Sequence, residues 1–352
     1  MTQELEFGLD TFGDATLGPD GSPLSHAQVI RNVVAEGVLA DRVGLNFIGI
    51  GEHHREDFAV SSPEIVMAAI AAQTEKIHVG SAVTVLSSDD PIRVYQRFSE
   101  VNAISNGRAE VILGRGSFTE SFPLFGFNLQ DYETLFEQKL DLFVEIIKEQ
   151  PVTWSGSIRS ALTEQRIFPP IEHGTLKAWI GVGGSPQSVV RAAHYGLPLM
   201  LAIIGGDPLR FRPYVDLYHR SLNEMGKNTL PVGQHSPGFV AATDAEAREL
   251  AWPHFRDMHA RIGAERGWPP FTRAQFDAEA GAEGALMVGS PETVAQKIAR
   301  SMIGLGVTRF DLKYSLGTLE HENLMECIRL YGTEVVPRVR EIVTTAQLLA
   351  TA

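Results

Sequence analysis

The chain has 352 residues, enough for one large α/β barrel or two ordinary domains. Its 30 basic residues against 43 acidic ones give a formal net charge of −13, and no basic block is present, which excludes nucleic acid and anionic membranes as expected partners. A single cysteine, Cys327, excludes a disulfide framework. The N-terminal segment lacks the layout of a signal peptide and the longest apolar run, 197–204, is too short to span a membrane, so we expect a soluble cytoplasmic protein.

Short apolar runs, each followed by a helical pattern, repeat along the chain. They predict eight strands, at 6–12, 46–51, 77–86, 109–113, about 178–182, 197–204, 236–241 and 308–313. Pairs of a capping residue and proline, where helices are expected to begin, recur at 62–63, 90–91, 185–186, 207–208 and 290–291. This alternation predicts the α/β class and a single (β/α)₈ TIM-like barrel domain over 1–352. An open doubly wound sheet is the alternative, but no GxGxxG follows the first strand.

Two segments interrupt the alternation. Residues 152–168 predict a small hairpin insertion, and residues 264–288, rich in Gly and Pro without a clear period, predict an irregular excursion at the C-terminal mouth of the barrel. The small-residue helix at 67–73 is expected to pack either against a second copy of the chain or inside the helical shell.

The turn between residues 182 and 186 is a candidate phosphate site. Gly183 and Gly184 end a strand, and Ser185 with the following proline starts a helix whose first N–H groups and positive dipole end favour an anion. Ser188, one turn later, would add a second hydroxyl on the same side. Arg115, between two glycines after the fourth strand, offers a guanidinium that matches phosphate. The alternatives are an ordinary capped turn and an ordinary ion pair.

Glu52, His53 and His54 follow the second predicted strand. Because side chains alternate along a strand, we expect one imidazole, His53, to face the barrel mouth and handle protons while His54 packs behind it. A purely structural histidine pair is the alternative. A metal site is disfavoured, because adjacent histidines on a strand do not point the same way and no further ligands complete a shell. A run of phenylalanines at 118–127 could wall a ligand or pack a loop.

Five motifs taken together resemble the bacterial luciferase-like flavin monooxygenase family. They are FIGIGEHH at 47–54, VGSAVTVLSSDDPIRV at 79–94, SNGRAEVILGRG at 105–116 with FPLFGFN at 122–128, GGSPQSVVRAAHYGLPL at 183–199 and VGSPETV at 288–294. The resemblance implies a TIM-like barrel that uses reduced FMN from a separate NAD(P)H-dependent flavin reductase and activates O₂ as a flavin peroxide to oxygenate a small organic substrate. Such proteins are often dimers.

The resemblance also assigns roles by motif. It implies that the FMN phosphate is held by Arg115, Ser185 and Ser188 with the backbone of Gly183 and Gly184, that Ala82 and Val83 form a strained, often cis, peptide against the isoalloxazine ring, and that His53 is the active-site histidine. Gly184 stands where luciferase subunits carry glutamate, and Asp90 where they carry histidine. Members that transfer hydride to or from the deazaflavin F420, and flavin-binding subunits without activity, are the alternatives.

Overall fold

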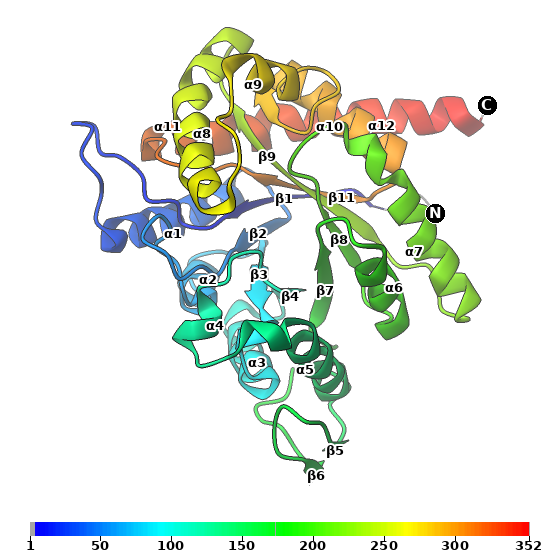
Figure 1. The fold of residues 1–352 in the computed structure, drawn as a ribbon. Coiled ribbons are helices and arrows are strands. Elements are labelled where there is room, and N and C mark those ends of the chain that lie inside the picture. Colours follow the sequence, from blue (N-terminus) through cyan, green and yellow to red (C-terminus); the bar gives the residue numbers. More distant parts are fainter. Residues whose placement is uncertain (1–3, 173, 352) are drawn as a thin grey trace.

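The computed structural model describes residues 4–172 and 174–351. Eight parallel strands close into a barrel in the order β1, β2, β3, β4, β7, β8, β9, β11 and back to β1 (Figure 1). Their bounds are β1 Glu6–Thr11, β2 Phe47–Ile50, β3 His78–Val85, β4 Ala109–Gly114, β7 Lys177–Val182, β8 Leu199–Ala202, β9 Val232–Val240 and β11 Arg309–Lys313. The pairing of β8 with β9 completes the ring. This closure confirms the predicted (β/α)₈ barrel over the open sheet.

Helices surround the strands. They are α1 His26–Arg42, α2 Pro63–Ala71, α3 Pro91–Ser105, α4 Ser121–Leu124, α5 Tyr132–Ile146, α6 Pro186–Tyr195, α7 Arg212–Glu224, α8 Asp244–Arg266, α9 Arg273–Glu279, α10 Pro291–Leu305, α11 His321–Leu330 and α12 Val336–Thr351. Each predicted pair of cap and proline starts a helix, with a short 3₁₀ turn at Pro208–Phe211 preceding α7. Along the described residues no helix is long and apolar enough to cross a membrane.

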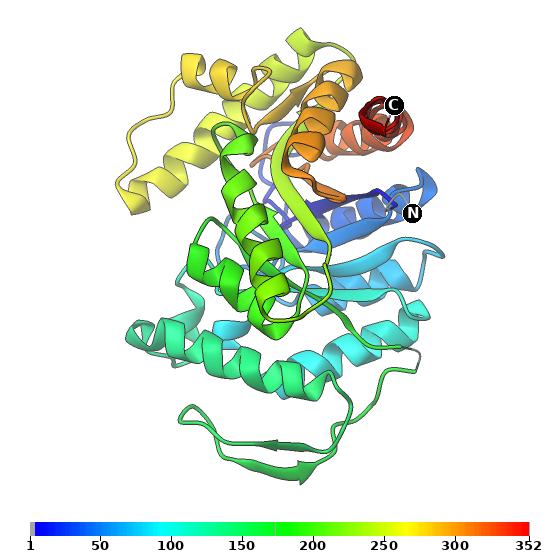
Figure 2. The ribbon, with the colours of Figure 1, turned by 90° about the vertical axis from the view of Figure 1, so that its right-hand side faces the viewer.

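The two interruptions of the alternation lie on opposite sides of the barrel. β5 Val152–Trp154 and β6 Leu162–Gln165 pair antiparallel and project from the body in both views (Figures 1 and 2). The segment 264–288, expected to be irregular, instead holds the end of α8, α9 and the short strand β10, Met287–Gly289, which pairs with β9. A capping box between Thr272 and Gln275 starts α9, which is too short to show a helical period in the sequence.

The small-residue helix α2 packs inside the shell. Met67 and Ile70 are fully buried, and a Cβ on Gly37 of α1 would lie 2.6 Å from Ile70 Cδ1. Glycine at position 37 therefore lets α1 approach α2 closely.

Two apolar clusters stabilise the barrel. The larger cluster lies between strands and helices and includes Phe7, Leu9, Ile48 and Ile50. The smaller one consists of Phe47, Ile112, Trp179 and Met200, with Ala82 and Val83 packed against it. Because side chains alternate along a strand, Phe47 points opposite to Ile48, so this smaller cluster fills the barrel interior.

A buried charge cluster closes the end of the barrel where strands begin. Arg309, fully buried at the start of β11, donates to Glu110 at 2.7 Å and to both oxygens of Asp311 at 3.1 Å. Its guanidinium carbon lies 3.8 Å from the ring centre of Phe47 and 4.9 Å from that of Trp179. Burial raises the pKa of Asp311 to about 6 even though Arg309 opposes the shift. We call this cluster the interior plug.

Candidate active site

The carboxyl ends of all barrel strands meet at one end, which we call the mouth. Most of the predicted site residues follow these ends: His53 after β2, Arg115 after β4 and the turn 183–185 after β7. β4 and β7 are parallel neighbours in which Leu113 lies opposite Ile180. Arg115 and the glycine turn therefore leave adjacent strands at the same end of the barrel.

His53 lies in a box of aromatic rings. Its ring centre is 4.5 Å from that of Phe12, 4.5 Å from that of Phe58 and 5.1 Å from that of Phe118. Burial lowers the pKa of His53 to about 3, and the nearby cations Lys313 and Arg55 act in the same direction. Within the described ranges, its ring makes no hydrogen bond. His53 therefore presents a neutral imidazole at physiological pH.

His54 has a different environment. Its Nε2 lies 3.0 Å from Glu52 Oε1, while Glu52 Oε2 accepts the Val85 N–H at 2.8 Å and so joins the end of β2 to the end of β3. β2 ends at Ile50, before both histidines, so strand alternation does not set the two ring directions. The loop instead gives one imidazole an apolar box and the other a carboxylate. In the described part of the chain, no group of three or more His, Cys, Asp or Glu is arranged to hold a metal.

The environment of His53 predicts a pH effect on stability. In the unfolded chain a histidine titrates near pH 6.5, whereas folded His53 stays neutral down to about pH 3. Below pH 6.5 the unfolded state therefore binds a proton that the folded state does not. The free energy of unfolding consequently decreases as the pH is lowered. On acidification from about pH 8 to pH 5, this difference lowers the free energy of unfolding of the wild type by about 2 kcal/mol. The His53→Gln variant, which lacks the imidazole, should not show this loss. Urea unfolding of both proteins measures it; equal losses on acidification would contradict the assignment.

Ala82 and Val83 form the interior wall of the mouth. They are joined by a cis peptide bond, and the pairing of β3 with β4 shifts register between Ala82 and Thr84. A Cβ on Gly114 would lie 2.5 Å from Val83 Cγ2, and one on Gly181 would lie 3.1 Å from Val83 Cγ1. These glycines on β4 and β7 therefore make the room that the Val83 side chain occupies.

Arg115 forms an ion pair with Glu133 of α5. Its guanidinium carbon also lies 5.5 Å from the ring centre of Tyr132, whose hydroxyl donates to the Gly116 carbonyl at 2.6 Å. The ion pair expected as the alternative for Arg115 is thus present. The side chain keeps 28% of its surface exposed, so it remains reachable for an anion from solvent.

The glycine turn has the geometry of a helix start with open backbone. A Cβ on Gly183 would meet no atom within 4 Å, and Gly184 has a φ of +113° that favours glycine. Ser185 caps α6, because its Oγ accepts the Ser188 N–H at 3.4 Å. Ser188 itself is buried, whereas Ser185 is half-buried.

Two polar pairs at the mouth were not predicted. His235 Nδ1 lies 2.5 Å from Asp10 Oδ2, and Lys313 Nζ lies 2.8 Å and 3.0 Å from the two oxygens of Asp14. Burial opposes protonation of His235, but the charge of Asp10 and its hydrogen bond outweigh this and raise its pKa. An imidazole oriented by a carboxylate is an arrangement suited to carry protons. His235 was not selected from the sequence, because this residue lies just before the strand predicted at 236–241. In the structure β9 starts earlier, at Val232, and includes His235.

Arg55 connects the loops around the mouth. It donates to Asp57 at 2.9 Å and to Glu265 at the end of α8 at 2.5 Å, and it also pairs with Glu120. The ring centre of Phe118 lies 4.8 Å from the guanidinium carbon of Arg55 and 4.7 Å from that of Arg266. Because Phe118 also contacts His53, this arrangement borders the aromatic box. We call it the Arg55 clasp.

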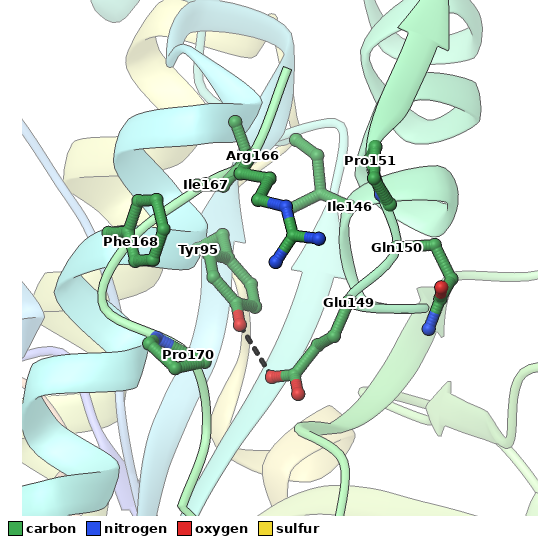
Figure 3. A pocket seen from close by; sticks show the side chains of 9 residues that line it. All are labelled: Tyr95, Ile146, Glu149, Gln150, Pro151, Arg166, Ile167, Phe168 and Pro170. Atoms are coloured by element: carbon green, nitrogen blue, oxygen red, sulfur yellow. Dashed lines mark hydrogen bonds between the residues drawn. The ribbon is translucent and has the colours of Figure 1, made fainter. Parts of the chain in front are cut away.

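A cleft of about 260 Å³ lies elsewhere, between α3, the end of α5 and the hairpin insertion (Figure 3). Tyr95 donates to Glu149 at 2.6 Å, and the side chain of Arg166 points into the space between Tyr95 and Glu149. The cleft contains none of the strand ends and none of the predicted site residues. The mouth, rather than this cleft, is therefore the candidate active site.

Comparison with known proteins adds to this geometry. The family model described as luciferase-like monooxygenase matches residues 11–309. The chain belongs to the luciferase-like monooxygenase family. One relative of this family member is the alkanal monooxygenase alpha chain of Photorhabdus luminescens, which is 24% identical over 251 residues, covering 67% of this chain and 65% of the relative.

Two solved structures have the same fold as this luciferase-like protein. The oxygenating constituent of 3,6-diketocamphane monooxygenase from Pseudomonas putida, a type II Baeyer–Villiger monooxygenase in complex with FMN, superimposes with a TM-score of 0.76 at 18% identity, over 96% of this chain and 99% of that one. An F420-dependent secondary alcohol dehydrogenase, bound to an F420–acetone adduct, gives 0.72 at 16% identity, over 96% and 100%. The same fold thus occurs in a monooxygenase in complex with FMN and in an F420-dependent dehydrogenase.

Proposed function

We propose that this luciferase-like protein is a two-component flavin monooxygenase. It receives reduced FMN from a separate NAD(P)H-dependent flavin reductase and uses O₂ to oxygenate a small organic molecule. The observation that carries the proposal is the placement of Arg115 and the turn 183–185 on neighbouring strand ends, at the mouth that also holds His53. The monooxygenase names of the relatives support it.

The donors at the mouth suit a phosphate monoester. Arg115 contributes a full positive charge and a fork of N–H donors, and the first turn of α6 contributes backbone N–H groups at the positive end of the helix dipole. Around Gly183 there is open space where a Cβ would stand, so a bulky anion can approach the backbone. We propose that these groups, with Ser185 and Ser188 supporting the turn, hold the FMN phosphate.

The interior of the mouth suits a flat ring. Ala82 and Val83 form one wall, and Gly49, where a Cβ would lie 2.6 Å from that of Ala82, lets β2 pack closely behind this wall. Bound reduced flavin would supply the electrons for reaction with O₂. His53, neutral among the three phenylalanine rings, offers one N–H donor and one acceptor nitrogen for handling a proton beside the ring. His235, oriented by Asp10, is a second imidazole able to carry a proton.

Arg115→Ala should weaken FMN binding more than any other single side-chain truncation. The variant removes the charge and the fork offered to a dianionic phosphate, a loss of about 1.5–3 kcal/mol. Isothermal or fluorescence titration measures it, with riboflavin, which lacks the phosphate, as the matched ligand whose affinity stays unchanged. An FMN affinity within about twofold of wild type would refute the phosphate assignment.

An F420-dependent hydride-transfer enzyme is the second candidate, favoured by the fold shared with the F420-dependent dehydrogenase. Parallel titrations with FMN and F420 distinguish the two.

A flavin-binding subunit without activity is the other alternative. It is tested by oxygen consumption with a generic flavin reductase and NADPH: a rate equal to that of the reductase alone would support it.

We further propose that the protein is a homodimer associated through the outer face of α2. Met67 and Ile70 are fully buried, whereas Ile65 at the start of the helix keeps 72% of its surface exposed. An exposed large apolar residue of this kind is compatible with a partner copy. Sedimentation velocity tests the proposal, and a monomer at micromolar concentration would contradict it.

A further inference from the structure

One carboxylate at the proposed phosphate site holds two guanidiniums. Glu133, in the first turn of α5, pairs through Oε1 with Arg115, and its Oε2 lies 3.5 Å from Arg191 Nη2 of α6. Glu137, one turn later in α5, lies 2.6 Å from the same Arg191 nitrogen. Arg115, Arg191, Glu133 and Glu137 thus form a cluster with no net charge, between the end of β4 and the helix that follows the glycine turn.

The members of this cluster differ in how much of their side-chain surface is exposed. Arg191 keeps only 12% of its side-chain surface exposed, and its guanidinium lies 5.5 Å from the ring centre of Phe136, whereas Glu133 keeps 55% exposed. An ion pair with so exposed a carboxylate is weak and is replaced readily. Moreover, Arg191 Nη1 is buried without a hydrogen-bond partner among the described residues. The cluster therefore has an unused donor, and Glu133 is the acceptor that Arg115 shares with Arg191.

A phosphate that approaches Arg115 meets this carboxylate first. A phosphate monoester carries close to two negative charges at neutral pH, so it competes with Glu133 for the same guanidinium and is repelled by it. We propose that Glu133 is an internal competitor for Arg115, which keeps the affinity for the flavin phosphate low so that the flavin exchanges as a co-substrate instead of remaining bound. This inference rests on the proposed role of Arg115 at the FMN phosphate.

The experiment compares FMN and riboflavin binding to the wild type, Glu133→Gln and Glu137→Gln. Both substitutions remove one negative charge from α5 and from the surroundings of Arg191, but only Glu133→Gln frees Arg115. We expect Glu133→Gln to bind FMN about tenfold more tightly, mainly through slower dissociation, because one nearby like charge at the protein surface costs about this much. Riboflavin affinity should stay the same in all three proteins, and Glu137→Gln should bind FMN as the wild type does.

Inorganic phosphate, titrated as a competitor of FMN, provides a second measurement. We expect it to displace FMN at a lower concentration from Glu133→Gln when FMN is held at the same saturation. An FMN affinity of Glu133→Gln that is unchanged or weaker would overturn the inference and make Glu133 a residue that positions Arg115. A gain shared equally by riboflavin or by Glu137→Gln would overturn it as well. If instead wild-type FMN and riboflavin bind equally and Arg115→Ala has no effect, the proposed phosphate site itself is wrong.

Discussion

Replacement of His53 by alanine is expected to uncouple oxygen consumption from substrate oxygenation. The variant removes the neutral imidazole from the aromatic box at the mouth, and loss of a general acid or base lowers a rate by about 10²- to 10⁴-fold. FMN affinity should stay within about twofold of wild type, because the phosphate end provides most of the anchoring. The measurement mixes protein and reduced FMN with oxygen in a stopped-flow instrument and follows the return of oxidised-flavin absorbance together with hydrogen peroxide. We expect a faster return in the variant, with one hydrogen peroxide formed per flavin in both proteins, because no organic substrate is present to take an oxygen atom.

His54→Ala is the matched control. This imidazole is bonded to Glu52, which in turn holds the Val85 N–H, so its loss should act on stability, by about 1.5–3 kcal/mol for a hydrogen bond to a charged group. Its oxidation time course should resemble that of the wild type. His53→Gln, which fills the box, guards against a folding defect in the alanine variant. If His54→Ala alone alters the time course, the two roles are reversed; if neither does, both histidines are structural.

Arg309→Met should cause the largest loss of stability. Methionine keeps an unbranched apolar side chain against Phe47 and Trp179. It leaves the buried Asp311 without its cation, however, and such a loss typically costs about 3–5 kcal/mol of stability. Glu110 is less affected, because Lys177 and His78 each lie 2.9 Å from it. Urea unfolding measures the loss. It should be smaller at about pH 5 than at pH 8, because Asp311, whose pKa is already about 6, then protonates at little cost.

The double variant Arg309→Met with Asp311→Asn separates charge from packing. Asparagine keeps the shape of the aspartate without its charge, so the double variant should regain most of the stability lost in Arg309→Met. A single-variant loss below about 1 kcal/mol, or a double variant no more stable than the single one, would show that the interior plug acts through packing alone.

Local signals in the sequence were sufficient for most of the fold. The pairs Ser185–Pro186 and Ser290–Pro291 each start a helix. Each pair acts within a single helical turn, so neighbouring residues are enough to recognise it. The start of β9 was missed for the opposite reason. Its residues Gln234 and His235 are polar because they bond to partners on distant elements, Ser301 on α10 and Asp10 on β1, so the strand shows no apolar run where it begins.

The residues of the candidate site fall into the same two groups, those recognisable from their neighbours in sequence and those that depend on distant contacts. His53 and Arg115 could be selected because each directly follows an apolar strand, a relation between neighbours in sequence. The Asp10–His235 pair joins residues 225 positions apart, and the Lys313–Asp14 pair joins residues 299 positions apart. Such pairs exist only because the last strand closes onto the first, and no local pattern records which side chains then meet.

The interior plug bears on how molecules could reach the candidate active site. Because Arg309, Phe47 and Trp179 are packed and buried at the end where strands begin, side chains close that end of the barrel. If the mouth binds a flavin as we propose, flavin, substrate and product would enter and leave on the same side of the barrel. An organic molecule that arrives first would then stand in the way of the flavin, and a flavin that leaves late would retain the product.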